Sequence, residues 1–239
     1  MNSNSLNIAL VISTLSGGGA ERVLSDMANY WSRCGHKVTL ITLSKAVPDF
    51  SYFISPKISR LELSAPISSQ NILSKTFSNL LLLKRLRLAF KDLEPDTVVS
   101  FIDTNNVLSL IASLGLKHKL IVSERVNPSA NYMLNNYWRF LRFVMYKFAE
   151  HLVVQTSDVK AIFSKSTKSE ISVIPNSLRH LPLPKSKRKK IILAVGRLAN
   201  QKGFDLLLHA FGRLHKKYPE WKIVILGEGP ERIKLENLV

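Results

Sequence analysis

The sequence has almost no cysteine and few acidic side chains. Cys34 is the only cysteine among 239 residues, so no disulfide can form within the chain, which fits a reducing compartment. The six histidines show no H-E-x-x-H pattern and have no cysteine partners at zinc-site spacing, so we expect no metal site. The chain has 34 Lys and Arg residues but only 17 Asp and Glu residues. The resulting net charge of +17 favours anionic partners.

Long hydrophobic runs are also missing. No stretch reaches the roughly 18 apolar residues that a transmembrane helix needs, so we expect any membrane contact to be peripheral. The N-terminal segment lacks the basic opening of a signal peptide, and its short apolar run, residues 6–12, predicts a buried strand instead. A cytoplasmic location is therefore expected.

Short apolar runs alternate with segments of helical spacing along most of the chain. Near-continuous apolar runs are typical of parallel strands that are covered on both faces. Strands are expected at 6–12, 35–43, 59–63, 96–101, 119–124, 151–156 and 170–176, and helices at 20–34 and 71–93. This order predicts a doubly wound α/β fold of the Rossmann-like kind.

A change of composition divides the chain into two domains. Residues 178–190 contain two prolines and a basic run, and we interpret them as a linker between an N-terminal domain, 1–177, and a second domain. Residues 191–239 predict strand, helix, strand and helix. Because such sheets typically hold about 4–6 strands, this segment is expected to be only the first part of a second Rossmann-like domain.

The string "LSGGGAERV" joins the first predicted strand to the first predicted helix. Its glycines are Gly17, Gly18 and Gly19. Glycines just before the start of a helix allow a phosphate to come close to the backbone, because no side chain stands in the way. A dinucleotide motif would need a glycine where Arg22 stands, and a nucleoside-triphosphate loop would need Gly-Lys where the chain has Gly-Ala, so NAD and ATP are not the expected ligands. A tight connection without a ligand remains an alternative.

The string "VGRLANQKGFDLLLHAF" places two cations around a predicted strand end and helix start. Arg197 follows the strand directly and Lys202 stands just before the helix. Two such cations could converge on one diphosphate at the carboxyl edge of a sheet. The alternative is a pair of solvated surface side chains.

These strings together resemble glycosyltransferase family 4, whose retaining enzymes have the two-domain GT-B fold. The opening through "GGGAER", then "VVSF", "SERVNP", "VVQTSDVKAIF", "ISVIPNSL", "ILAVGRLANQKGF" and "KIVILGEGP" are similar to successive blocks of that family, in the same order. The resemblance implies a GT-B-like fold over nearly the whole chain, with no cofactor and a nucleotide-sugar as donor substrate.

The resemblance also implies roles for individual residues. Arg197 and Lys202 match the catalytic pair that holds the donor diphosphate and stabilises charge on the departing phosphate. Gly227, Glu228 and Gly229 match a donor-binding loop near the nucleoside. The glycine turn matches an acceptor-side or reaction-centre loop, which Glu21 and Arg22 continue; helix capping is the alternative role of Glu21.

The string "SERVNP" departs from the family pattern at Val126 and Asn127, so an acid role at this loop does not follow from the resemblance. Glu124 and Arg125 match the family. Arg125 could contact donor phosphate or acceptor, or could only pair with Glu124. Asp103 stands where a site residue could stand, but we expect it to cap a helix.

The family carries a pair of glutamates later in the second domain, beyond the last residue of this chain. By resemblance, the expected activity is sugar transfer with retention to a saccharide or polyprenyl-linked acceptor in bacterial surface polysaccharide biosynthesis. The alternatives are a truncated inactive remnant, or one half of a two-chain enzyme whose second chain supplies the missing half. Nucleic acid is not an expected partner, because the basic residues are dispersed and aromatic stacking motifs are missing.

Two segments are candidates for contact with an anionic membrane at the inner face of the cell membrane. Residues 135–148 are apolar nearly all round, with Arg139, Arg142 and Lys147 interspersed, as in interfacial helices. Residues 80–91 are the second candidate. The alternative for both is a helix that packs on the sheet.

Overall fold

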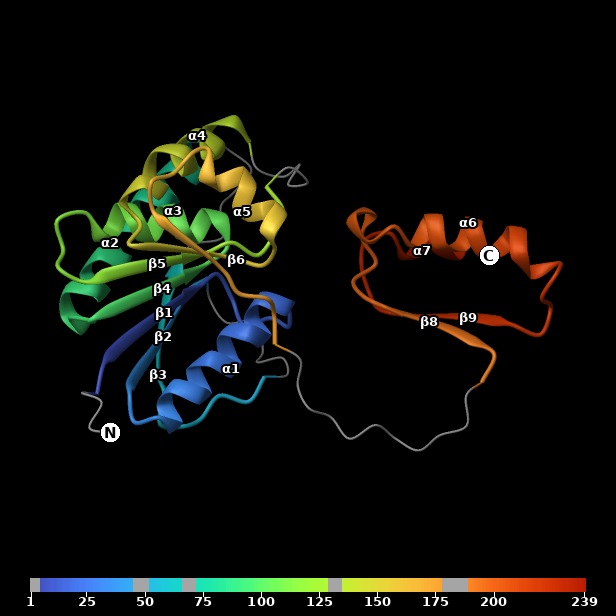
Figure 1. Ribbon diagram of the computed structural model, residues 1–239, viewed down its shortest axis with the longest axis horizontal. Coiled ribbons are helices and arrows are strands. Elements are labelled where there is room, and N and C mark those ends of the chain that lie inside the picture. Colours follow the sequence, from blue (N-terminus) through green and yellow to red (C-terminus); the bar gives the residue numbers. More distant parts are fainter. Residues whose placement is uncertain (1–4, 45–51, 66–71, 129–134, 178–188) are drawn as a thin grey trace. The chain divides into compact units, whose positions relative to one another are not determined.

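The computed structural model describes residues 5–44, 52–65, 72–128, 135–177 and 189–239 (Figure 1). The chain divides into two compact units, Met1–Leu178 and Arg179–Val239. Most of the predicted linker, residues 178–190, lies outside the described residues.

Unit 1 is built on a seven-stranded sheet in the order β3-β2-β1-β4-β5-β6-β7. Every neighbouring pair of these strands is parallel. The strands are β1 Asn7–Ile12, β2 Lys37–Ser44, β3 Ser59–Ala65, β4 Thr97–Phe101, β5 Lys119–Ser123, β6 His151–Val154 and β7 Glu170–Val173. The predicted α/β fold class is thereby confirmed, with strand bounds that differ from the expected ones by up to three residues.

Helices cover both faces of this sheet. They are α1 Gly19–Arg33, α2 Ile72–Leu93, α3 Asp103–Ser113, α4 Asn136–Met145 and α5 Ser157–Ser164, and the 3-10 turn η1 Tyr146–Phe148 follows α4. Figure 1 shows α1 on one side of the sheet and α2 to α5 on the other. The doubly wound arrangement predicted from the sequence is therefore confirmed.

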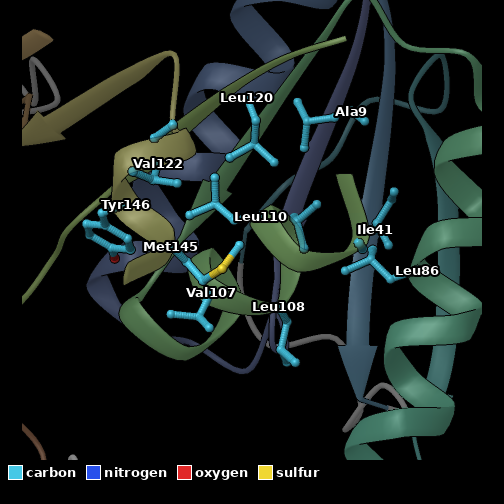
Figure 2. Close-up of a cluster of buried hydrophobic side chains, with 14 of the residues drawn as sticks. Ala9, Ile41, Leu86, Val107, Leu108, Leu110, Leu120, Val122, Met145 and Tyr146 are labelled. Atoms are coloured by element: carbon cyan, nitrogen blue, oxygen red, sulfur yellow. The ribbon is translucent and has the colours of Figure 1, made fainter. Parts of the chain in front are cut away.

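Alternate residues of each strand enter different cores. Ala9 and Val11 of β1 belong to the cluster on the α2 to α5 side, whereas Leu10 and Ile12 belong to the cluster on the α1 side. Figure 2 shows the first cluster, in which Leu110 of α3 lies among the strand side chains. Because both faces of β1 are buried, this strand is apolar at every position from Ile8 to Ile12 and not only at alternate ones.

The junction between β4 and α3 differs from the predicted one. Ile102 occupies the N-cap position, and Asp103, the expected cap, is the first helical residue. Asp103 Oδ1 accepts hydrogen bonds from the backbone N–H of Thr104 at 2.7 Å and from its hydroxyl. Ile102 has φ 77°, a left-handed conformation that is costly for a β-branched residue, so strain is stored at this strand end.

Unit 2 contains a two-stranded parallel sheet, β8 Ile191–Val195 and β9 Lys222–Leu226. The 3-10 turn η2 Asn200–Lys202 and α6 Phe204–His215 follow β8, and α7 Arg232–Glu236 follows β9. The buried core of this unit consists of Leu198, Phe204 and Leu235. The predicted order of strand, helix, strand and helix is therefore present in this unit.

No helix among the described residues is both long enough and apolar enough to cross a membrane.

Candidate functional site

The carboxyl ends of the parallel strands of unit 1 meet at one edge of the sheet, where α/β proteins bind ligands. The glycine turn follows β1 at this edge, Glu124 and Arg125 follow β5, and residues 174–177 follow β7. The structure therefore brings the predicted glycine turn and the SERVNP loop to the same edge.

The three glycine positions of the turn differ in how a side chain would be accommodated there. Gly17 has φ 99°, which side chains rarely permit. A Cβ at Gly18, the N-cap residue of α1, would overlap with the carboxylate of Glu21, which folds back over the helix start. A Cβ at Gly19 would meet nothing within 4 Å. Open space for a close approach thus exists at Gly19.

Arg22 and Arg125 contact the same segment after β7. Nη2 of Arg22 donates a hydrogen bond to the carbonyl oxygen of Ser177 at 3.3 Å, and Nη1 of Arg125 donates to Oδ1 of Asn176 at 2.8 Å. The sequence identified both arginines but not Asn176 or Ser177. The block "ISVIPNSL" contains both residues, but nothing in it indicates which distant side chain they contact.

Arg125 is half-buried between this segment and the sheet. Its guanidinium carbon lies 4.0 Å from the centre of the Phe101 ring, a cation–π contact. Burial lowers the pKa of Arg125 to about 10. Its partners are Phe101 and Asn176, and the alternative pairing of Arg125 with Glu124 is not formed.

Glu124 turns inward, on the opposite side of the sheet from Arg125. It is 3% exposed, its Oε1 accepts a hydrogen bond from the hydroxyl of Tyr146 at 2.5 Å, and Nη1 of Arg142 lies 3.8 Å away. Burial raises the pKa of Glu124 to about 7, against the opposing effects of Tyr146 and Arg142, and the charge of Asp103 raises it further. A substrate cannot reach this carboxyl group without displacing its partners.

In unit 2, the turn after β8 carries Arg197 and Lys202. Both side chains are exposed, and neither has a hydrogen-bond or ion-pair partner within the described ranges. The stem of Lys202 lies over Gly196, since its Cδ is 3.9 Å from where a Cβ of Gly196 would stand. The two cations therefore belong to one compact turn that begins at Gly196.

The loop after β9 is fastened to this turn through the main chain. The backbone N–H of Leu198 donates to the carbonyl oxygen of Glu228 at 2.9 Å. A Cβ at Gly227 would overlap with the carbonyl of Gly196, and one at Gly229 would overlap with that of Leu198. Close packing of the main chain therefore requires glycine at both positions, which the sequence did not reveal.

A family model described as Glycosyltransferase Family 4 matches residues 17–180, which include the glycine turn and the SERVNP loop. The chain belongs to glycosyltransferase family 4. A second model, described as Glycosyl transferases group 1, matches residues 179–239. The predicted family is confirmed.

Curated relatives of this family are longer than the chain. A Campylobacter jejuni protein is 31% identical over 98% of this chain and 65% of its own length. Its name is GalNAc-alpha-(1->4)-GalNAc-alpha-(1->3)-diNAcBac-PP-undecaprenol alpha-1,4-N-acetyl-D-galactosaminyltransferase. An uncharacterized glycosyltransferase of Haemophilus influenzae is 32% identical over 93% of this chain and 62% of its own. The chain thus spans less than two thirds of either relative.

A solved structure, sucrose-phosphate synthase from Thermosynechococcus elongatus, resembles the chain in fold. The TM-score is 0.79 at 15% identity, over 97% of this chain and 66% of that protein. At this identity the likeness supports the GT-B-like fold alone.

Proposed function

We propose that the chain takes part in transferring a sugar from a nucleotide-sugar to a saccharide or lipid-linked acceptor, in bacterial surface polysaccharide biosynthesis. Family membership supports this proposal, as does the name of the Campylobacter jejuni relative, which describes a sugar transferase for an undecaprenol-linked saccharide. The observation that carries it is the pair of exposed cations Arg197 and Lys202 in one turn, neither of which has a hydrogen-bond or ion-pair partner among the residues that the structure describes.

The donor diphosphate is assigned to unit 2. Arg197 and Lys202 can hold its oxygens with charge-assisted hydrogen bonds, which are stronger than neutral ones. They would also stabilise the negative charge that develops on the departing phosphate. The loop from Gly227 to Gly229 would fix the shape of this turn, because it bonds to Leu198 and abuts Gly196.

The acceptor is assigned to the carboxyl edge of unit 1. The open space at Gly19 would admit a close backbone contact, and Arg22 and Arg125 stand at the same edge, bonded to residues 176 and 177. The bond between the anomeric carbon and the phosphate oxygen would break, and the acceptor oxygen would bond to the same face of the sugar. The acceptor proton would pass to the leaving diphosphate, so that configuration is retained.

Calorimetric titration of the whole chain with UDP, GDP and pyrophosphate tests the donor assignment. We expect Arg197→Ala and Lys202→Ala each to weaken diphosphate binding about tenfold, the effect of losing a charged hydrogen bond. Arg213→Ala and Lys216→Ala, which remove exposed cations at the far end of α6, should leave binding unchanged. Equal affinity in all four variants, or no diphosphate binding by the unaltered chain, would contradict the assignment.

A second chain is a further partner in this proposal. Leu193 and Val195 of β8 and Leu226 of β9 are 59%, 72% and 52% exposed, and a cavity of about 460 Å³ lies between β9 and α7. Apolar side chains exposed along a strand are typical of a sheet surface that another segment covers. We infer that further donor-domain strands cover this sheet in the active enzyme, supplied by a second chain where this chain acts as one half.

An anionic membrane surface is the proposed partner of α4. Tyr137, Phe140 and Phe143 are 64%, 64% and 48% exposed, and Nζ of Lys147 lies 4.6 Å from the centre of the Phe143 ring. Trp138 packs against the core on the inner side. The helix is therefore not apolar all round: its outer face combines aromatic rings with cations, and no acidic residue occurs in 135–148. This face supports a peripheral location at the cytoplasmic membrane.

The second candidate segment, residues 80–91, is less suited to a membrane. Nη1 of Arg85 donates to the carbonyl oxygens of Leu63 and Ser64, and Nη1 of Arg87 donates to those of Ala112 and Leu114. These guanidinium groups fasten α2 to the neighbouring elements of unit 1. Among the two segments, α4 is therefore the one that would contact the membrane.

Sedimentation with phosphatidylglycerol vesicles and with phosphatidylcholine vesicles tests the α4 surface. We expect binding to the anionic vesicles alone, declining as salt is raised. The double change Phe140→Ser and Phe143→Ser should abolish it. Phe53→Ser, at a 76% exposed position away from α4, is the matched control. Unchanged binding by the double variant would contradict the proposal.

A further inference from the structure

Glu124 and Arg125 are neighbours in sequence, but their side chains lie on opposite sides of the sheet. Leu120 and Val122 of β5 enter the cluster on the α2 to α5 side, and the buried carboxyl group of Glu124 continues that alternation. Arg125 points the other way and lies over Phe101, which belongs to the cluster on the α1 side. The two residues therefore connect two different layers of unit 1.

Four groups from three elements surround the carboxyl group of Glu124. The hydroxyl of Tyr146 in η1 donates to it, and Arg142 of α4 lies 3.8 Å away. Asn106 of α3 donates to the Tyr146 hydroxyl at 2.9 Å, and also to the carbonyl oxygen of Ser123 at 3.2 Å. Asp103 of α3 acts on Glu124 through its charge. The carboxyl group thus fixes the end of β5 to η1 and α4, and Asn106 links the same strand end to α3 through Ser123 and Tyr146.

The backbone at this point has one more anchor. The N–H of Glu124 donates to the carbonyl oxygen of Val153 in β6 at 2.9 Å. The position of Arg125 is then determined by the anchored residue before it and by Asn176, to which its guanidinium bonds. A change in the Glu124 cluster can therefore reach Arg125 through the peptide bond that joins the two residues.

We propose that Glu124 is a positioning residue, which places Arg125 at the carboxyl edge of the sheet by fastening the β5 end to Tyr146 and Arg142. Glu124 itself does not touch substrate. The inference rests on the proposed function only in assigning Arg125 to the acceptor side; the contacts that carry it are independent of any activity.

Nitrogen-detected titration of the Arg125 Nε–Hε signal, in the labelled 239-residue chain, tests this inference. The signal is assigned by its loss in Arg125→Lys. The pKa of Glu124 is raised to about 7, so we expect the Arg125 signal to move with a midpoint near pH 7. Glu124→Gln, which keeps an acceptor oxygen for Tyr146 but cannot ionise, should abolish the movement.

Glu150→Gln, an exposed change at the other edge of the sheet, is the matched control and should retain the movement. Tyr146→Phe is the second variant. It keeps the carboxyl group of Glu124 but removes the hydroxyl that donates to it, and it should shift the midpoint of the Arg125 titration. An Arg125 signal that ignores pH in the unaltered chain, or that still titrates in Glu124→Gln, would overturn the inference. If the role of Glu124 were only structural, its substitution would lower the melting temperature of the chain but would leave the Arg125 titration unchanged.

Discussion

The main chain of Gly227 lies directly against the carbonyl group of Gly196, with no room for a side chain between them. The backbone N–H of Gly196 donates to the carbonyl oxygen of Leu226 at 3.0 Å, so the two turns are also hydrogen-bonded. The turn that carries Arg197 therefore depends on glycine in a loop that is distant in sequence.

Gly227→Ala should destabilise unit 2. The added methyl group meets backbone atoms that cannot rotate away, and overpacking of this kind costs about 1–3 kcal/mol. Thermal unfolding followed by circular dichroism measures the loss. Gly212→Ala in α6, where a Cβ meets nothing within 4 Å, is the control and should not destabilise.

Gly17→Ala and Gly19→Ala should differ in their effects. At Gly17, φ of 99° makes alanine unfavourable by about 1–2 kcal/mol. At Gly19, the first residue of α1, the methyl group enters open space and stability should be kept. If this space admits the acceptor, Gly19→Ala should weaken the binding of a saccharide acceptor in a calorimetric titration. Unchanged acceptor binding in Gly19→Ala would count against the acceptor-side assignment.

The free energy of unfolding should depend on pH through Glu124. Its folded pKa, about 7, lies above the ordinary value of 4.5, so the folded state holds a proton that the unfolded state releases. This contribution is full at low pH and is lost as pH rises through 7. Between pH 5 and 8 the unaltered chain should lose about 2 kcal/mol relative to Glu124→Gln. Urea unfolding at both pH values measures it; a constant difference would show an ordinary pKa.

The chain alone should transfer sugar weakly or not at all. It spans 65% and 62% of the two curated relatives, and its two-stranded sheet exposes apolar side chains. Turnover of labelled nucleotide-sugars by the purified chain, with and without lysate of the source cells, measures this. Robust turnover by the chain alone would contradict the inference that further donor-domain strands are needed.

Local patterns were sufficient to predict the fold. The apolar run at β1 and the helical spacing in α1 each concern neighbouring residues, and hydrophobic burial on two faces leaves few alternatives for such a pattern. Long-range side-chain contacts were not predictable in this way. Nothing in the sequence pairs Arg125 with Asn176, or Arg142 with Glu124, because these contacts depend on strand order and on which face each side chain enters.

The same limit explains two differences from the expected site. Arg142 was expected to lie at a membrane face because residues 135–148 combine apolar side chains with cations. Its side chain is only 13% exposed, however, and lies close to Glu124. Asp103 was expected to cap α3, but Ile102 holds the cap position with a left-handed backbone. Propensity alone does not favour isoleucine there, so the surrounding structure must impose that conformation.

The unequal cores of the two units have a consequence for amide hydrogen exchange. Amides of β1 and β4 lie between two large buried clusters and should be protected up to the global unfolding of unit 1. Amides of β8 and β9 are backed by three buried side chains and should exchange through small, frequent openings. Ligands that occupy the turn at Arg197 would then be detectable as slower exchange in β8 and β9, before any chemistry is measured.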